Sequence, residues 1–396
     1  MTENTKAIEQ VKNVGLDGGN SGVKIFCEDN AGKEVSLYIP TVVSMYLGDK
    51  TENLDPKDVP AEDLEKQIDV TINSKALTFN GSRYIVGKKV LTDHMAATET
   101  EENSDKSTDD VVAVVSLAGL AILAMKESPE SNNIKVKYDL GLNLPVNDIN
   151  KKTAKINNER FIGTHEVIFH HPEREVKVTL EIEFANTLPE GASAAWGIVY
   201  DKNGKPVVRQ VEINDKLEKK SLENEMILHF DIGGNSSEVV VTKGVAFVPK
   251  LSNGLTYGVK KTVSQIREIW NHKHNKRTID SLLEFNEIYL NSEHPRHLEL
   301  KELSKNPLIQ LAETFSRVII DKIDGLKDDP YVFIYGGGAE ILKTYLIDIL
   351  TKKKRMKNVI FLEDPLFTNA KGSKVYTDSP RFKKKKEEYL EAVANG

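Results

Sequence analysis

A strand-turn-strand pattern with the same polar residues occurs twice in this chain, and it constrains the fold more than any other feature. The first copy is VGLDGGNSGVKIF at residues 14–26, and the second is ILHFDIGGNSSEVVV at residues 227–241. In each copy an apolar run ends near an aspartate, Asp17 or Asp231, and Gly, Asn and Ser precede a second apolar run. Recurrence of one supersecondary unit indicates two related halves. The sequence therefore predicts two similar, strand-rich domains.

Both turns have the composition of a phosphate-binding loop. Glycine lets backbone N–H groups approach an anion closely, and the hydroxyls of Ser21 and Ser236 add hydrogen-bond donors. The preceding aspartates would repel phosphate unless a cation lay between them, and Mg²⁺ binds a few carboxylates, waters and phosphate oxygens together. Two such turns facing one another would hold a magnesium-bound nucleoside triphosphate. The alternative is a pair of ordinary hairpin turns, in which Asp and Gly are common.

A third glycine motif, YGGGAEIL at residues 335–342, follows an apolar run and precedes a helical pattern. Its backbone could contact a flat base or a sugar at the N-terminus of the helix. The chain lacks both the GxGxxG spacing of dinucleotide folds and the GxxxxGK[ST] spacing of P-loops, which argues against a typical dehydrogenase and a P-loop nucleotidase. Strands that alternate with helices indicate an α/β protein.

The most apolar stretch, VVAVVSLAGLAILAM at Val111–Met125, is shorter than the roughly 18 residues that a membrane-spanning helix needs. Asp109 and Asp110 precede it and suit the first turn of a helix, so the sequence predicts a buried helix. The polar start of the chain predicts a frayed leader over residues 1–12 without a secretion signal. The single cysteine, Cys27, fits a reducing cytosol. We therefore expect a cytoplasmic protein without membrane contact.

These motifs resemble those of the actin, sugar-kinase and heat-shock ATPase superfamily, in the same order. LDGGNSGVK is similar to its phosphate 1 motif, YDLGLNLPV to connect 1, FDIGGNSSEVVV to phosphate 2, YGGGAEIL to adenosine and FTNAKGSKVY to connect 2. The resemblance spans residues 14 to about 376. Within the superfamily, the chain is most similar to bacterial plasmid-segregation actins of the ParM type.

The resemblance implies an α/β fold with two ribonuclease-H-like (actin-like ATPase) domains that flank a nucleotide cleft. The expected domain I comprises residues 13–200 and 366–396, domain II comprises 226–365, and 201–225 form a charged inter-domain excursion. The cofactors would be ATP or GTP with Mg²⁺. Asp17 and Asp231 would hold the metal through its waters, and Lys24 would reach the phosphates. The implied nucleotide-binding residues are Gly18, Gly19, Asn20, Ser21, Lys24, Gly233, Gly234, Asn235, Ser236, Gly336, Gly337, Gly338 and Glu340.

The catalytic residue implied by the resemblance is Glu190. In this superfamily a Glu or Gln on the turn after the domain I hairpin positions the attacking water, and NTLPEGASAAWG places Glu190 there. A carboxylate beside the γ-phosphate can orient and polarise water. The alternative is that Glu190 is an acidic residue in the first turn of the helix after Pro189.

The resemblance implies a filament-forming ATPase or GTPase that hydrolyses its nucleotide after polymerisation and segregates plasmid DNA. An adaptor bound to the plasmid centromere would make the DNA contact, which agrees with the formal net charge of −6, since DNA-binding surfaces are usually basic. The alternatives are a sugar or small-molecule kinase of the same superfamily and a cell-shape actin homologue. A kinase would need a general-base aspartate beside its substrate, and no separate candidate stands out in the sequence.

Overall fold

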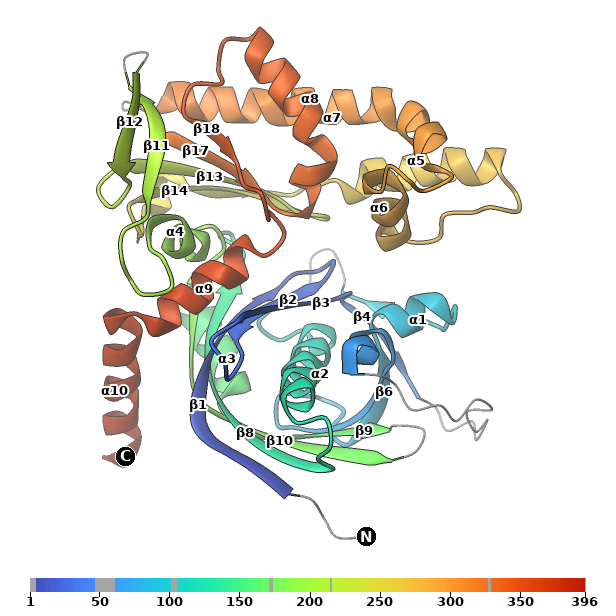
Figure 1. Ribbon diagram of the computed structural model, residues 1–396, viewed down its shortest axis with the longest axis vertical. Helices are drawn as coiled ribbons and strands as arrows, with labels where there is room; N and C mark the ends of the chain where they lie inside the picture. The colour runs from blue at the N-terminus through green and yellow to red at the C-terminus, as the bar shows by residue number, and fades with distance from the viewer. Residues whose placement is uncertain are drawn as a thin grey trace. The chain divides into compact units, whose positions relative to one another are not determined.

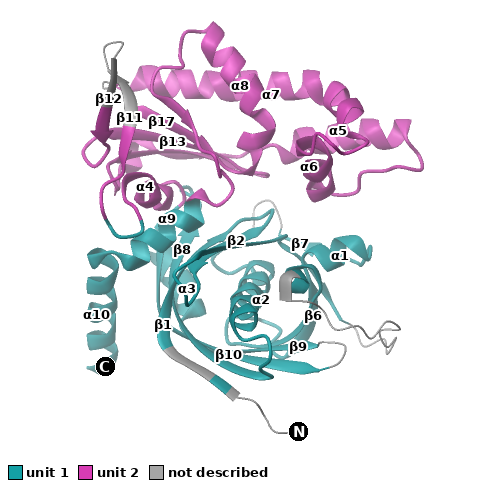
Figure 2. Ribbon diagram, in the orientation of Figure 1, with its two compact units in different colours: residues 1–189, 202–204, 369–396 teal, residues 190–201, 205–368 magenta. Residues whose placement is uncertain are grey.

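The chain forms two compact units in the computed structural model, which describes residues 5–46, 61–100, 105–170, 174–213, 216–326 and 329–395. Unit 1 comprises residues 1–189, 202–204 and 369–396, and unit 2 comprises residues 190–201 and 205–368 (Figure 2). Residues 190–200 thus pack with unit 2, whereas the sequence analysis assigned them to domain I. The predicted domain limits stay a prediction.

Unit 1 is built on a ten-stranded sheet with the strand order β3-β2-β1-β8-β10-β9-β5-β6-β4-β7. The strands are β1 (Thr5–Gly18), β2 (Val23–Glu28), β3 (Glu34–Ile39), β4 (Val42–Met45), β5 (Ile68–Asn73), β6 (Ser82–Val86), β7 (Thr98–Glu99), β8 (Asn133–Leu144), β9 (Gly163–His170) and β10 (Glu175–Pro189). The predicted leader is wrong for residues 5–12, because they extend β1 and pair in parallel with β8 from Thr5 onward. Backbone pairing with β8 holds this polar segment, and Lys12 also forms an ion pair with Glu127.

Helix α2 (Asp110–Glu127) lies inside the curled sheet of unit 1, as Figure 1 shows. Every residue in Val111–Met125 is buried, and the side chain of Asp109 accepts hydrogen bonds from the N–H groups of Val111 and Val112. A helix that is apolar on all faces must be enclosed, which confirms the predicted buried helix. No helix among the described residues is both long enough and apolar enough for a membrane crossing.

The described part of unit 1 has five further helices, of which η1 packs on α2. They are η1 (Ala61–Lys66), α1 (Lys88–Thr92), α3 (Lys151–Phe161), α9 (Thr368–Asp378) and α10 (Pro380–Ala394). Helix α9 packs directly on neighbouring glycines of β1 and β8: a Cβ atom on Gly15 would lie 1.9 Å from the carbonyl oxygen of Ala370, and one on Gly141 would lie 2.7 Å from that of Ser373. Only glycine allows this approach, so the sheet and α9 are fitted to each other.

Unit 2 has a six-stranded sheet with the order β15-β14-β13-β17-β18, in which β16 also pairs with β14. Its strands are β13 (Met226–Ile232), β14 (Ser237–Lys243), β15 (Ala246–Phe247), β16 (Asn253–Leu255), β17 (Tyr331–Tyr335) and β18 (Val359–Phe361). Its helices are α4 (Ala192–Val199), η2 (Pro249–Leu251), α5 (Lys260–Lys273), α6 (Leu282–Leu290), α7 (His297–Gly325) and α8 (Gly337–Lys352). A core with Leu228 and Phe230 packs under α5, α7 and α8, and Ile227 faces α4 on the other side of the sheet.

The charged range 201–225 contains a separate two-stranded hairpin within the described residues. Its strands are β11 (Val208–Ile213) and β12 (Lys216–Ser221), paired antiparallel from Val208 with Ser221 to Ile213 with Lys216. Figure 1 shows this hairpin next to α4 and β14. The hairpin therefore gives the charged segment a regular structure of its own.

Candidate functional site

The first repeated turn joins β1 to β2 and holds an ion pair. Asp17 and Lys24 face each other across the two strands, with 3.3 Å between the Lys24 Nζ and an Asp17 carboxylate oxygen. Asp17 is only 5% exposed. A Cβ atom on Gly19 would lie 2.5 Å from the Lys24 Nζ, so the lysine side chain lies across the turn. The turn thus combines a buried carboxylate, a cation and glycine backbone in one place.

The second repeated turn joins β13 to β14 and is held by backbone contacts. The N–H of Val259 donates to the carbonyl of Gly233 at 3.1 Å, and the N–H of Lys260 donates to that of Gly234 at 2.9 Å. A Cβ atom on Gly258 would lie 2.4 and 2.3 Å from these two oxygens. The segment that leads into α5 therefore packs tightly on the turn. This contact requires a glycine at position 258, which the sequence alone did not indicate.

The adenosine-like motif lies directly beside Asp231. Asp231 in β13 is the register partner of Tyr335 in β17, and Gly336, at the N-cap of α8, has a φ of 92°. A Cβ atom on Gly336 would lie 2.2 Å from a carboxylate oxygen of Asp231. The structure thus brings Asp231 and the predicted glycines Gly336–Gly338 together in unit 2, and Asp17, Lys24 and the first turn together in unit 1.

Each of the two turns contains one buried hydrogen-bond acceptor that lacks a donor in the described part of the chain. The amide oxygens of Asn20 and Asn235, at the same place in the two repeats, are buried and have no hydrogen-bond partner among the described residues. A buried acceptor without a donor costs about 1–3 kcal/mol. Metal-bound waters and ribose hydroxyls could supply the missing donors, whereas an ionised phosphate could not. The loops therefore fit a hydrated magnesium–nucleotide better than a bare anion.

The described residues contain no group of three or more His, Cys, Asp or Glu side chains that could hold a metal ion. Magnesium usually binds through one or two carboxylates and keeps several waters, with substrate phosphates as further ligands. Each of the two turns carries one carboxylate, which is few enough for such a site, and the metal assignment of Asp17 and Asp231 stays a prediction.

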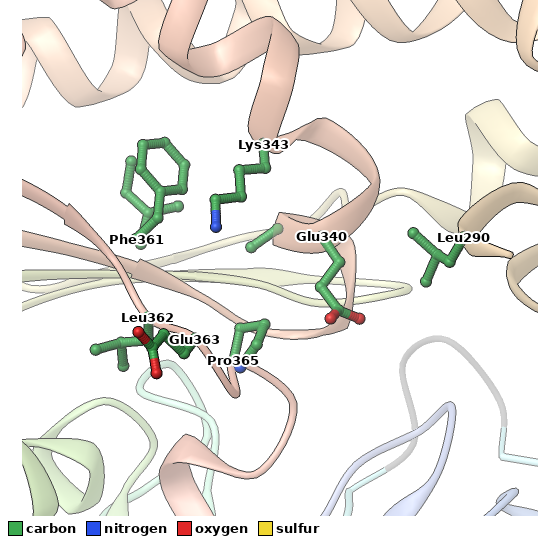
Figure 3. A pocket seen from close by; sticks show the side chains of 9 residues that line it. Leu290, Glu340, Lys343, Phe361, Leu362, Glu363 and Pro365 are labelled. Carbon is green, nitrogen blue, oxygen red and sulfur yellow. The ribbon is translucent and has the colours of Figure 1, made fainter. Parts of the chain in front are cut away.

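A pocket of about 240 Å³ lies beside the start of α8 in unit 2 (Figure 3). It is lined by Leu290, Ile334, Ala339, Glu340, Lys343, Phe361, Leu362, Glu363 and Pro365. Its walls are mainly apolar, and Glu340, Glu363 and Lys343 add two acidic side chains and one basic side chain. Burial, together with the nearby Asp364, raises the pKa of Glu340, and Lys343 opposes this shift. Such a pocket suits a flat ring with polar edges.

Sequence reasoning found Glu340 in this pocket but missed its other walls. Lys343 could have been found, because it lies three residues after Glu340 on the same helix and so on the same face. Leu290 at the end of α6, and Phe361 and Pro365 near β18, come from distant parts of the chain. No local pattern marks them.

Glu190 lies in the turn between β10 and α4 and is 8% exposed. The N-cap of α4 is Gly191, with a φ of 76°, and no acidic residue lies in the first turn of this helix. A Cβ atom on Gly191 would lie 2.7 Å from the Val240 side chain in β14. Glu190 thus precedes the helix rather than belonging to its first turn, as the alternative interpretation required. Its catalytic role stays a prediction.

Two family models match this chain in consecutive parts. Residues 15–192 match the model of the actin-like proteins N-terminal domain, and residues 229–348 match the C-terminal model of the archaeal actin homologue MreB-like family. A comparison with curated protein sequences found no match.

Solved actin-like structures match along nearly the whole length. The actin-like protein Alp7A has a TM-score of 0.71 at 18% identity, covering 98% of this chain and 99% of its own. The ParM of Bacillus thuringiensis with ATP has a TM-score of 0.68 at 17% identity, covering 93% and 98%. The archaeal actin homologue Ta0583 has a TM-score of 0.61 at 15% identity, covering 93% and 99%.

At such low sequence identity, these structural similarities show the fold alone. They confirm the predicted α/β, two-domain actin-like class. The family models cover the two repeated turns in the order in which the chain carries them. The chain thus has the actin-like fold, and its sequence matches two family models of actin-like proteins in consecutive parts.

Proposed function

We propose that this chain is a nucleotide-dependent, filament-forming actin-like ATPase that segregates plasmid DNA through an adaptor protein. The observation that carries the proposal is the pair of repeated turns, each with a buried asparagine oxygen that lacks a donor. Structures of Bacillus thuringiensis ParM with ATP, AMPPNP and ADP support nucleotide binding by relatives of this fold. The sedimentation experiment described below distinguishes ATP from GTP.

The residues of the two turns would share the work of binding. Bound Mg²⁺ would supply the charge that neutralises the phosphates. Asp17 and Asp231 would accept hydrogen bonds from waters on the metal, and the glycine N–H groups with Ser21 and Ser236 would donate to phosphate oxygens. The Lys24 ammonium lies next to Asp17 and would place a second cation at the same turn.

The remaining proposed roles belong to unit 2. The base would enter the pocket beside Glu340 and Lys343, where apolar walls exclude water from its faces. Gly336, Gly337 and Gly338 would let the ribose lie close to the start of α8. Glu190 would accept a hydrogen bond from the attacking water and hold it in line with the γ-phosphate.

Assembly would follow from a difference in affinity between nucleotide states. A ligand shifts an equilibrium only as far as it binds one state better than the other, so the triphosphate form would self-associate and hydrolysis would weaken the lattice. Heterologous head-to-tail contacts produce open filaments rather than closed rings. Because the net charge is −6, we assign contact with plasmid DNA to an adaptor, and we place the protein in the cytoplasm.

Sedimentation and light scattering with ATP, GTP, AMPPNP or no nucleotide test the assembly. We expect pelleting with ATP or GTP and longer-lived polymer with AMPPNP, and none without nucleotide. A sugar kinase would stay in the supernatant in every case and release nucleoside diphosphate only with its acceptor. A cell-shape actin would also sediment with nucleotide. In cells, however, it would not move DNA through a plasmid-encoded adaptor.

Replacing the catalytic candidate tests the chemistry. With Glu190→Ala, phosphate release should fall by about 100-fold, because general-base assistance typically contributes 10²–10⁴ in rate. Polymer should still form with ATP and should persist. Glu293→Ala, at an exposed glutamate of unit 2, is the matched control. Phosphate release equal to that of the control would remove Glu190 from the mechanism.

A further inference from the structure

Helix α4 connects Glu190 to the β11–β12 hairpin. Seven of its eight residues are buried, and it packs on β13 and β14. At its start, the backbone of Gly191 lies against Val240, which leaves the turn with Glu190 no space to shift toward β14. The position of Glu190 therefore depends on the position of α4 as a whole.

The C-terminus of α4 is held by the chain that returns to form β11. The N–H of Val207 donates to the carbonyl of Val199 at 2.8 Å, and a guanidinium nitrogen of Arg209 donates to the carbonyl of Ile198 at 3.2 Å. The Arg209 guanidinium also lies 5.3 Å from the centre of the Phe333 ring in β17. Arg209 thus links the hairpin, the last turn of α4 and the central sheet of unit 2.

The surroundings of Arg209 suit a helix C-terminus rather than an ion pair. Its Nε is buried without a hydrogen-bond partner, and the described side chains give it no carboxylate within salt-bridge distance. By contrast, Lys220 on the other strand of the hairpin pairs with Glu225 at 3.0 Å. The exposed carbonyls of a helix end carry partial negative charge, which a cation there stabilises. Arg209 is partly buried, and no carboxylate among the described side chains offsets the desolvation of its charge, so its placement at α4 calls for a reason.

We infer that Arg209 is a positioning residue for Glu190: it fixes the last turn of α4 and thereby the seat of the carboxylate at the other end of this helix. The inference rests on the proposed role of Glu190. The inference also gives the start of the hairpin, where Arg209 lies, a part in hydrolysis, although no residue of the hairpin is proposed to bind the nucleotide. A displacement of about 1 Å at a reacting group can cost up to 100-fold in rate, so a small shift of α4 is sufficient.

The test compares Arg209→Met, which keeps the length of the side chain but removes its charge and donors, with Arg209→Lys, which keeps the charge. Arg174→Met is the matched control, because Arg174 also donates to a backbone carbonyl, that of Pro129, but lies in unit 1. Three quantities are measured on the full chain: single-turnover phosphate release, the affinity for AMPPNP by calorimetry, and hydrogen exchange at the amides of α4.

We expect Arg209→Met to slow phosphate release about ten-fold while the AMPPNP affinity stays within about two-fold. The amides of Ala195 and Tyr200 should exchange faster, and Arg209→Lys should recover part of the rate and protection. Unchanged release and protection in Arg209→Met would overturn the inference, as would a parallel loss of nucleotide affinity. Normal release by Glu190→Ala would instead refute the proposed role of Glu190, so the two failures are distinguishable.

Discussion

The two repeated turns have nearly the same sequence, but different neighbours hold them. Around the β1–β2 turn the nearest neighbours are side chains: a Cβ atom on Gly18 would meet Val112, one on Gly19 would meet Lys24 and, slightly farther away, the carbonyl of Gly22, and one on Gly22 would meet Tyr38. Around the β13–β14 turn backbone carbonyls lie close to Gly233, Gly258 and Gly336, and Gly336 also faces the carboxylate of Asp231. Side chains can change rotamer at little cost, whereas packed backbone cannot.

This difference suggests a division of labour between the two turns. The Asp17–Lys24 pair can separate when a ligand competes for either charge, because the lysine has several rotatable bonds. Asp231 has the backbone start of α8 against it and must keep its place. The first turn can therefore adjust its side chains when a ligand binds, whereas the second turn keeps its conformation. The following predictions test this contrast, from the largest expected effect to the smallest.

The largest effect is expected for Gly336→Ala. The substitution would force a Cβ atom to 2.2 Å from an Asp231 oxygen at a φ of 92°, so the free energy of unfolding of unit 2 should fall by about 3 kcal/mol. Chemical denaturation measures this change. Gly325→Ala is the control, since a Cβ atom there would meet nothing within 4 Å. Equal stability of the two variants would contradict a rigid second turn.

The next effect concerns the carboxylate of the adjustable turn. Asp17→Asn should weaken magnesium–AMPPNP binding about 100-fold, since a hydrogen bond to a charged group contributes about 1.5–3 kcal/mol. Calorimetry with and without magnesium measures the affinity. Asp348→Asn, at an exposed residue that pairs with Lys352, is the control. If Asp17→Asn binds as tightly as Asp348→Asn, Asp17 has no part in holding the metal.

The third prediction uses pH. His229 lies two residues before Asp231 in β13, is fully buried, and has its pKa lowered by burial to about 3. An unfolded histidine binds a proton near pH 6.5, so between this pH and the folded pKa the unfolded chain binds more protons than the native one. The unfolding free energy should therefore fall on acidification below about pH 6.5, by up to about 1.4 kcal/mol per pH unit for this one group.

His229→Gln removes the titrating group and should flatten this part of the stability profile, as urea unfolding at a series of pH values would show. His272→Gln, at an exposed histidine of α5, should leave the slope unchanged. The same slope in both variants would mean that acid acts elsewhere, and that the strand carrying Asp231 is no more acid-sensitive than the rest of the protein.

The smallest effect is expected for Lys24→Met. Loss of this mostly buried ion pair should lower the unfolding free energy by about 1–2 kcal/mol, while AMPPNP affinity should fall about ten-fold and become less sensitive to salt. Titrations at two salt concentrations measure both affinity and its salt dependence. Lys33→Met, at an exposed lysine between β2 and β3, is the control. A large loss of stability would show that Lys24 is structural and not an adjustable partner.

Sequence reasoning succeeded where a local pattern has one physical solution. The run Val111–Met125 is apolar on every face and starts at two aspartates, so it could only be an enclosed helix with an acidic N-terminus. The two Asp–Gly turns were found for the same reason, because a strand that ends in Asp and Gly must turn. In both cases neighbours in the chain determine the outcome.

Sequence reasoning failed where the partner of a residue is distant in the chain. The polar segment Thr5–Lys12 becomes a strand because β8 offers it a pairing edge, and nothing within the segment signals this. The β11–β12 hairpin within the charged range 201–225 was not predicted, because its contacts with α4 and β17 come from other parts of the chain. Gly258 is required by the carbonyl oxygens of Gly233 and Gly234, more than twenty residues earlier. Only the assembled fold reveals such requirements.

The contact of α9 with Gly15 and Gly141 bears on how this protein is made in the cell. Unit 1 takes its sheet from residues before 190 and its helices α9 and α10 from residues after 367, and unit 2 is synthesised in between. A nascent chain on the ribosome can therefore complete unit 2 before unit 1 receives its final helices. Until α9 is made, Gly15 and Gly141 lack the helix that packs on them, so unit 1 cannot finish folding before unit 2 has been synthesised.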